Sequence, residues 1–135
     1  MKQPPTDLKI LETIYDNYYS DFAGFNRGDE GRESKILVPI DIEAIAQELG
    51  VDRDIVFGRL YYHLDKKYGY WRKDGTKVSF FVPKVGKDLH CVNFPLMASV
   101  LAGLREEDKK YNLAMLIAAG SLLVAIVSLA ISIAS

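Results

Sequence analysis

The fold of the polar part of the chain is decided by the stretch IAQELGVDRDIVFGRL, residues 45–60. Ile45 and Leu49 repeat with the spacing of one helical face, and the Gly50 that follows is the residue type that most often ends a helix. Asp52 suits the N-cap of a second helix, because its carboxylate can accept hydrogen bonds from backbone N–H groups of the first turn. The stretch therefore predicts two helices joined by a very short turn.

The second of these helices is predicted to extend over residues 53–67. Its inner face would consist of Val56, Leu60 and Leu64, a repeat in uniform steps of four residues. The first helix is predicted to begin after Asp41, which can cap it in the same way as Asp52 caps its neighbour.

Weaker signals precede this helix pair. The spacing of apolar residues predicts a helix over residues 6–19, and we expect the glycine-rich, charged segment 20–34 to be a mobile surface loop. Residues 36–38 are apolar and are followed by Pro39, which is typical of a short strand.

A β-hairpin is predicted over residues 70–82. Asp74-Gly75 is among the strongest short-range turn signals, because both central residues of a two-residue hairpin loop need positive φ. Such a loop would place Arg72 opposite Lys77 on the outer face of the hairpin. Four apolar side chains would then share the inward face: Trp71, Val78, Phe80 and Val82.

In this order of elements the chain resembles the winged helix-turn-helix family over about residues 6–85. Residues 45–60 resemble its core, with Ala46 where the two helices cross and Gly50 at the turn. The steps of four from Val56 to Leu64 depart from the three-residue step with which the family usually closes, and they allow a helix one turn longer.

The resemblance implies an α+β fold made of a small winged-helix domain, residues 1–87. A linker helix within residues 88–111 and a transmembrane anchor at residues 112–135 would follow it. It also implies binding of double-stranded DNA by a transcription regulator, with the second helix of the pair in the major groove and the hairpin as the wing.

The distribution of charge agrees with that implication. Residues 1–51 hold 5 basic and 10 acidic side chains, whereas residues 52–87 hold 9 basic and 4 acidic ones. Phosphate contacts supply most non-specific affinity for DNA. The expected contacts on the helix are Arg53, Ile55, Arg59, Tyr62 and Lys66, and those on the wing are Arg72, Lys73 and Lys77. Neutralising the three wing residues should weaken binding alike for all sequences.

A second function fits the same residues. Base edges are read mainly by Arg, Lys, Asn and Gln, and on the outward face of the helix only Arg59 is well placed for this. Ile55, Gly58 and Tyr62 suit a protein surface at least as well. A glycine inside a helix costs about 1 kcal/mol relative to alanine, so Gly58 either admits a close partner or is merely tolerated. The alternative is a membrane-docked adaptor that binds another protein.

The C-terminal part of the chain predicts a membrane span. Residues 113–134 include no charge, and a helix of this length is about 33 Å long, against roughly 30 Å for the hydrocarbon core of a bilayer. A fully buried core helix is the alternative. Arg105, Lys109 and Lys110 precede the span, so we expect a single-pass, tail-anchored protein of the cytoplasmic membrane with its N-terminal domain in the cytoplasm. No secretory signal is visible at the N-terminus.

Two segments could support a homodimer. Four small residues share one face of the predicted span, where membrane helices can approach closely: Ser121, Ala125, Ser128 and Ser132. Alternatively, these hydroxyls bond to their own helix. Apolar residues in 94–110 also repeat with helical spacing, and winged-helix relatives often dimerise through such a helix, although this one could equally pack on its own domain.

Catalytic signals are weak. Cys91 is the single cysteine, so a disulfide within the chain is excluded, and its neighbour His90 would point away from it in an extended segment. His63 is expected to be packed rather than catalytic. The chain contains neither a phosphate-binding glycine loop nor a nucleophile elbow. We therefore expect no enzyme, no metal and no cofactor.

Overall fold

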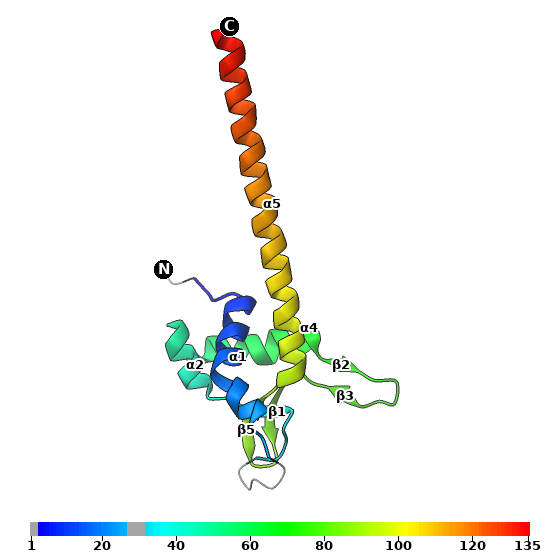
Figure 1. Cartoon of the computed structure of the whole chain (residues 1–135). Helices are drawn as coiled ribbons and strands as arrows, with labels where there is room; N and C mark the ends of the chain where they lie inside the picture. The colour runs from blue at the N-terminus through cyan, green and yellow to red at the C-terminus, as the bar shows by residue number, and fades with distance from the viewer. Residues whose placement is uncertain (1–2, 27–31) are drawn as a thin grey trace. The chain divides into compact units, whose positions relative to one another are not determined.

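Helices and two small antiparallel sheets build the first part of the chain, and one long apolar helix builds the last part. The computed structural model describes residues 3–26 and 32–135. It divides into two compact units, Met1–Leu101 and Ala102–Ser135 (Figure 1). The α+β class and the long C-terminal apolar helix are as predicted.

The first helix, α1, extends over Asp7–Ala23. Thr6 caps it, because its Oγ1 accepts a hydrogen bond from the backbone N–H of Lys9 at 3.1 Å. The helix ends four residues later than predicted and takes up the beginning of the expected loop 20–34. Within that loop, residues 27–31 lie outside the described residues.

The helix pair follows the predicted caps. Helix α2 extends over Ile42–Leu49, and Asp41 Oδ1 accepts from the backbone N–H of Ala44 at 3.1 Å. Gly50 ends it with φ at 71°, in the left-handed region. Helix α3 then begins after Asp52, whose Oδ1 accepts from the backbone N–H of Asp54 at 2.8 Å.

The second helix of the pair changes its winding along its length. Helix α3, Arg53–Gly58, continues without a break into a π-helical segment, η1, Arg59–Leu64, and then into α4, Asp65–Tyr68. Residues spaced by four overshoot one turn of an α-helix by about 40° at each step. The wider π turn takes up this drift, and Val56, Leu60 and Leu64 are all fully buried. The π-helical segment thus keeps three residues spaced by four on the same buried face of the helix.

A three-stranded antiparallel sheet supports the helices. It consists of β1 (Leu37–Pro39), β4 (Phe81–Val85) and β5 (Asp88–Asn93) in the order β1-β5-β4. Our assignment of residues 88–93 to the linker is therefore wrong, because they form the central strand. Their pairing with β1, such as Val38 with Val92, joins segments more than fifty residues apart, and a local pattern does not reveal it.

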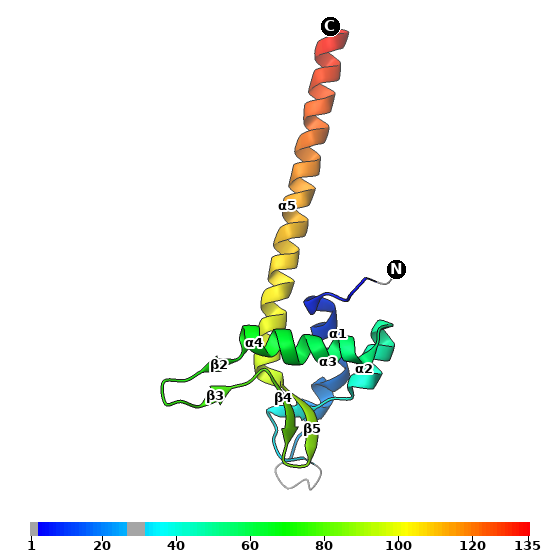
Figure 2. The same ribbon diagram turned by 180° about the vertical axis from the view of Figure 1, so that it is seen from behind.

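The Asp74-Gly75 hairpin forms a separate sheet of β2 (Tyr70–Trp71) and β3 (Lys77–Val78). In both views it extends from the end of α4 in a different direction from the β4–β5 hairpin (Figures 1 and 2).

The predicted register of this hairpin is wrong by one residue. Trp71 pairs with Lys77, because the loop has three residues and Gly75 adopts a φ of 90°. The backbone N–H of Arg72 donates to the carbonyl of Thr76 at 2.8 Å. A shift of one residue turns side chains to the opposite face. Trp71, expected to point inward, is 70% exposed, whereas Phe80 is buried as predicted.

Helix α5 extends over Phe94–Ala134, so both predicted C-terminal helices belong to one element. In the first unit, Phe94, Met97 and Leu101 are buried, and the Phe94 ring stacks on Tyr15 and Phe22. The start of α5 is thus part of the core. Of the two roles predicted for this segment, dimerisation or packing on its own domain, the buried residues support the second. In the second unit, the most apolar 18-residue window has a mean hydropathy of 2.6 and none of it is buried. The helix is long and apolar enough to cross a membrane.

Candidate functional site

Arg59, the predicted base-reading residue, is not free at the surface. Its Nη1 donates to Asp7 Oδ1 at 2.8 Å and to the carbonyl of Pro5 at 2.9 Å, and its side chain is only 21% exposed. His63 Nε2 lies 3.6 Å from the second oxygen of the same carboxylate. The prediction that Arg59 faces outward is therefore wrong, because the N-terminus of α1 binds it from 52 positions away.

Arg53 is at the surface, where it contacts two carboxylates. Its guanidinium lies 3.6 Å from Glu43 and 3.5 Å from Asp54. Such exposed ion pairs contribute little, typically 0–1 kcal/mol, so they can be exchanged for another anion.

The outward face of the helix is aromatic and apolar. Ile55 is 47% exposed and Tyr62 is 71% exposed, as predicted. Tyr61 is also exposed; its ring stacks on Phe57 and meets Tyr62 edge-on. An extended aromatic surface therefore continues from α3 into η1.

A groove of about 400 Å³ brings the helix and the strands together. Tyr62 and Lys66 line it from the helix, Lys77 from β3, and Pro83 from β4. Three of the predicted contact residues thus share one surface, whereas Arg72 lines a second groove, of about 380 Å³, together with Lys77.

Asp65, at the floor of this region, is neutralised within the protein. Its Oδ2 accepts from Lys77 Nζ at 2.9 Å. Its Oδ1 accepts from the backbone N–H groups of Phe80 at 2.9 Å and Phe81 at 3.2 Å. Asp65 thereby fixes the junction between the helix and strands β3 and β4. Nothing in its local sequence indicates these partners.

The hairpin presents two basic side chains with no internal counter-charge. Arg72 and Lys73 are exposed, and within residues 3–26 and 32–135 no ion pair involves either of them. At the loop, hydrogen bonds from the hydroxyl and backbone N–H of Thr76 hold the pKa of the Asp74 carboxyl below its usual value of 3.8. Beside these residues Tyr70 and Trp71 are exposed, and sequence reasoning missed both as surface residues.

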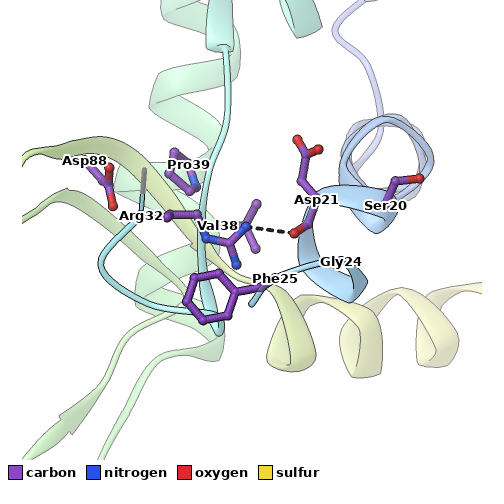
Figure 3. A pocket seen from close by; sticks show the side chains of 8 residues that line it. All are labelled: Ser20, Asp21, Gly24, Phe25, Arg32, Val38, Pro39 and Asp88. Atoms are coloured by element: carbon purple, nitrogen blue, oxygen red, sulfur yellow. Dashed lines mark hydrogen bonds between the residues drawn. The ribbon is translucent and has the colours of Figure 1, made fainter. Parts of the chain in front are cut away.

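A cavity of about 530 Å³ lies beside Arg32 (Figure 3). All three guanidinium nitrogens donate to backbone carbonyls: Nη1 to Asp21, Nε to Ser34 and Nη2 to Lys35. The guanidinium also lies 4.5 Å from the centre of the Phe25 ring. Arg32 therefore clamps the end of α1 to the segment that leads into β1, a role that sequence reasoning did not predict.

The neighbours His90 and Cys91 lie in the central strand. The Cys91 thiol is buried, and burial, followed by the charge of Asp88, raises its pKa to about 11. A thiol that stays protonated at neutral pH is a poor nucleophile. The His90 ring contacts Phe57 and Phe81. Across the described ranges, no group of three His, Cys, Asp or Glu side chains is arranged to hold a metal ion.

The small residues of the predicted span lie on helix α5 and are exposed: Ser121, Ala125, Ser128 and Ser132. Their spacing places them on one face of the helix, and their role in packing against a second copy remains a prediction.

Compared with protein-family models, with curated proteins and with solved structures, the chain matches none.

Proposed function

We propose that this protein is a membrane-anchored winged-helix regulator that binds DNA at the cytoplasmic surface of the membrane. The observation that carries the proposal is the helix pair α2–α3, with its tight turn at Gly50, packed beside a sheet in the order β1-β5-β4. In a winged helix with this strand order, the hairpin that pairs with β1 would be the wing. That hairpin is β4–β5, and β2–β3 is an additional ribbon.

The charged groups favour phosphate contacts over base reading. Arg59 is bound by Asp7, whereas Lys66, Arg72 and Lys73 are exposed and make no ion pair with another described residue. Binding through such cations is steeply salt-dependent and nearly independent of sequence. The regulator would therefore bind duplexes of any sequence with similar affinity. Its choice of target would depend on other factors, such as its location at the membrane.

The anchor in this proposal is the apolar segment of α5. Arg105, Lys109 and Lys110 precede it, and the positive flank of a span usually stays in the cytoplasm. The head would then meet DNA in the same compartment.

A salt titration tests the DNA proposal. The full chain in neutral detergent micelles is titrated with a labelled random duplex, and the anisotropy is followed at several salt concentrations. Lys66→Ala, Arg72→Ala and Lys73→Ala should each reduce the slope of log K against log salt by about 0.9, the loss of one phosphate contact. Lys9→Ala, an exposed lysine of α1, is the matched control and should leave the slope unchanged. Equal slopes in all four variants would exclude these contacts.

A protein partner is the second candidate, and the exposed aromatic face of the helix favours it. Ile55 and Tyr62 offer apolar area there, and the arginine that could read bases is bound elsewhere. A Cβ added at Gly58 would meet Tyr62 Cδ2 at 3.7 Å, an ordinary contact, so the fold itself does not require glycine at this position. The close approach of a protein partner is one reason for a glycine at this position.

Tyr62→Arg separates the two functions. A cation in place of the phenol should abolish capture of a protein partner, because it puts a charge into an apolar contact. The same change should leave duplex binding intact or strengthen it. Loss of duplex binding in Tyr62→Arg, with the fold retained, would contradict the phosphate-contact mechanism.

A further inference from the structure

Exposed aromatic and basic side chains recur between Tyr61 and Lys77. From Tyr61 through the β2–β3 hairpin the sequence reads YYHLDKKYGYWRKDGTK, residues 61–77. Tyr62, Tyr70 and Trp71 are exposed by 71%, 51% and 70%, and Lys66, Arg72 and Lys73 are exposed beside them. Phosphate contact needs only the cations, so the exposed rings call for a separate explanation.

The pairing of the hairpin places Trp71 on the same face as Lys77, a residue that lines the groove. Trp71 lies directly opposite Lys77, and side chains of directly opposed residues project from the same face of a hairpin. Lys77 Nζ reaches Asp65 on α4 and lines the groove together with Tyr62 and Lys66. Trp71 therefore shares a face of the hairpin with a lysine that lines the groove.

Exposed rings beside cations are the chemistry that binds unpaired nucleobases. Every base has a π face that stacks on an aromatic side chain, which contributes about 1–3 kcal/mol per base, while basic side chains follow the backbone. In a duplex the base faces are covered by their neighbours, so rings on a protein surface gain nothing from them. Single-stranded nucleic acid uses both kinds of side chain.

We propose that the surface formed by Tyr62, Lys66, Lys77 and Trp71, with Lys73 in the adjoining loop, binds single-stranded nucleic acid by stacking bases on Tyr62 and Trp71. This deepens the nucleic-acid role proposed above, because it names the form of nucleic acid that the surface prefers. The shared chemistry is an unpaired base next to a phosphate, which single-stranded DNA and RNA both supply.

Trp71 makes the proposal directly measurable, because it is the only tryptophan of the chain. Full-length protein in neutral micelles is titrated with four probes of equal length: single-stranded DNA, single-stranded RNA, duplex DNA and an abasic phosphodiester strand. The indole emission and the anisotropy of the labelled probe are both recorded. Stacking predicts strong quenching of Trp71 by one or both base-containing single strands, and little quenching by the duplex or the abasic strand.

Variants relate the signal to affinity. Trp71→Ala should weaken single-strand binding about 5- to 150-fold, the equivalent of one stacked base, and change duplex binding less than twofold. Trp71→Phe should retain most of the affinity because it keeps a ring. Tyr111→Ala, which removes an exposed ring on α5, is the matched control and should have no effect.

Several outcomes would overturn the inference. Equal quenching by the abasic strand would reduce the surface to phosphate binding, and Trp71 emission that responds to anionic lipid vesicles but to no strand would make the hairpin a lipid contact. The two proposals also fail separately. If the protein binds duplex DNA but Trp71 emission does not change with single strands, only this inference is wrong. If single strands quench Trp71 and the duplex does not bind, only the proposed duplex regulator is wrong.

Discussion

Asp65 satisfies three donors at once, and this makes it the residue on which the geometry of the candidate site depends. It joins α4 to Lys77 and to the backbone between β3 and β4. Its side chain is 15% exposed, so the amides that it accepts from have little access to water.

Asp65→Ala should therefore destabilise the first unit by about 1–3 kcal/mol, because two backbone N–H groups lose their acceptor. Thermal unfolding of the full chain in micelles, followed by near-UV circular dichroism, measures this loss. Hydrogen exchange at Phe80 and Phe81 should also accelerate.

Asp16→Ala is the control for this change, since Asp16 is an exposed carboxylate on α1 and surface substitutions usually stay within about 0.5 kcal/mol. Equal unfolding temperatures for the two variants would mean that Asp65 does not fix the junction.

Residues such as Arg59 limit what a sequence can predict at this scale. A helical wheel with a uniform 100° step places Arg59 outward, but the π segment begins at that residue and Asp7 lies far away in the sequence. Ile55 and Tyr62 were placed correctly because apolar periodicity alone determines which side of the helix faces the core.

At the scale of elements, local signals were sufficient for the helices. The caps at Asp41, Gly50 and Asp52 act within three residues, and each predicted the helix boundary where the structure has it. Strand β5 was missed because its pairing with β1 is long-range. The hairpin was found but misaligned, since Asp-Gly suits loops of two or three residues and the hydrogen bonds between Asp74 and Thr76 accompany the longer one.

The hairpin loop should carry a pH dependence with a defined sign. The Thr76 hydrogen bonds lower the pKa of Asp74 below 3.8, so the ionised carboxylate is the form that supports the loop. This support is fully present above the unfolded value and is lost as the pH falls through the lower folded value. A carbon-13 NMR titration of the Asp74 carboxyl measures the pKa directly.

Thr76→Ala should raise the pKa of Asp74, because the hydroxyl donor is the largest contribution to the shift. Thr76→Ser keeps the hydroxyl and should leave the titration close to that of the original chain. If Asp74 titrates at 3.8 or above in the unmodified protein, the three-residue loop geometry is wrong.

At the scale of the whole molecule, the chain combines a charged head with a long apolar helix that could cross a membrane. The apolar helix was the easiest element to predict, because 22 uncharged residues in a row are a signal of composition alone. The limits of the head were harder to predict, since Phe94, Met97 and Leu101 belong to its core although they lie on the same helix as the apolar segment.

Extraction from membranes tests the span. The full-length chain should remain with the membrane fraction at alkaline pH in carbonate. Leu123→Lys together with Ile126→Lys should release it, because two central lysines cost about 5–7 kcal/mol and offset the gain of the apolar residues. Leu123→Ala with Ile126→Ala is the matched control and should stay in the membrane. Release of the unmodified chain by carbonate would contradict a transmembrane helix.

The hydrogen bonds from Arg59 to Pro5 and Asp7 make the position of a side chain in the middle of the chain depend on residues at its beginning. A protease that cut just after Asp7 would remove both acceptors in one step and leave the Arg59 guanidinium without them on the side of η1. Cleavage at that point would therefore make the Arg59 guanidinium available for other partners. The helix surface near Arg59 would change its charge although none of its own residues had changed.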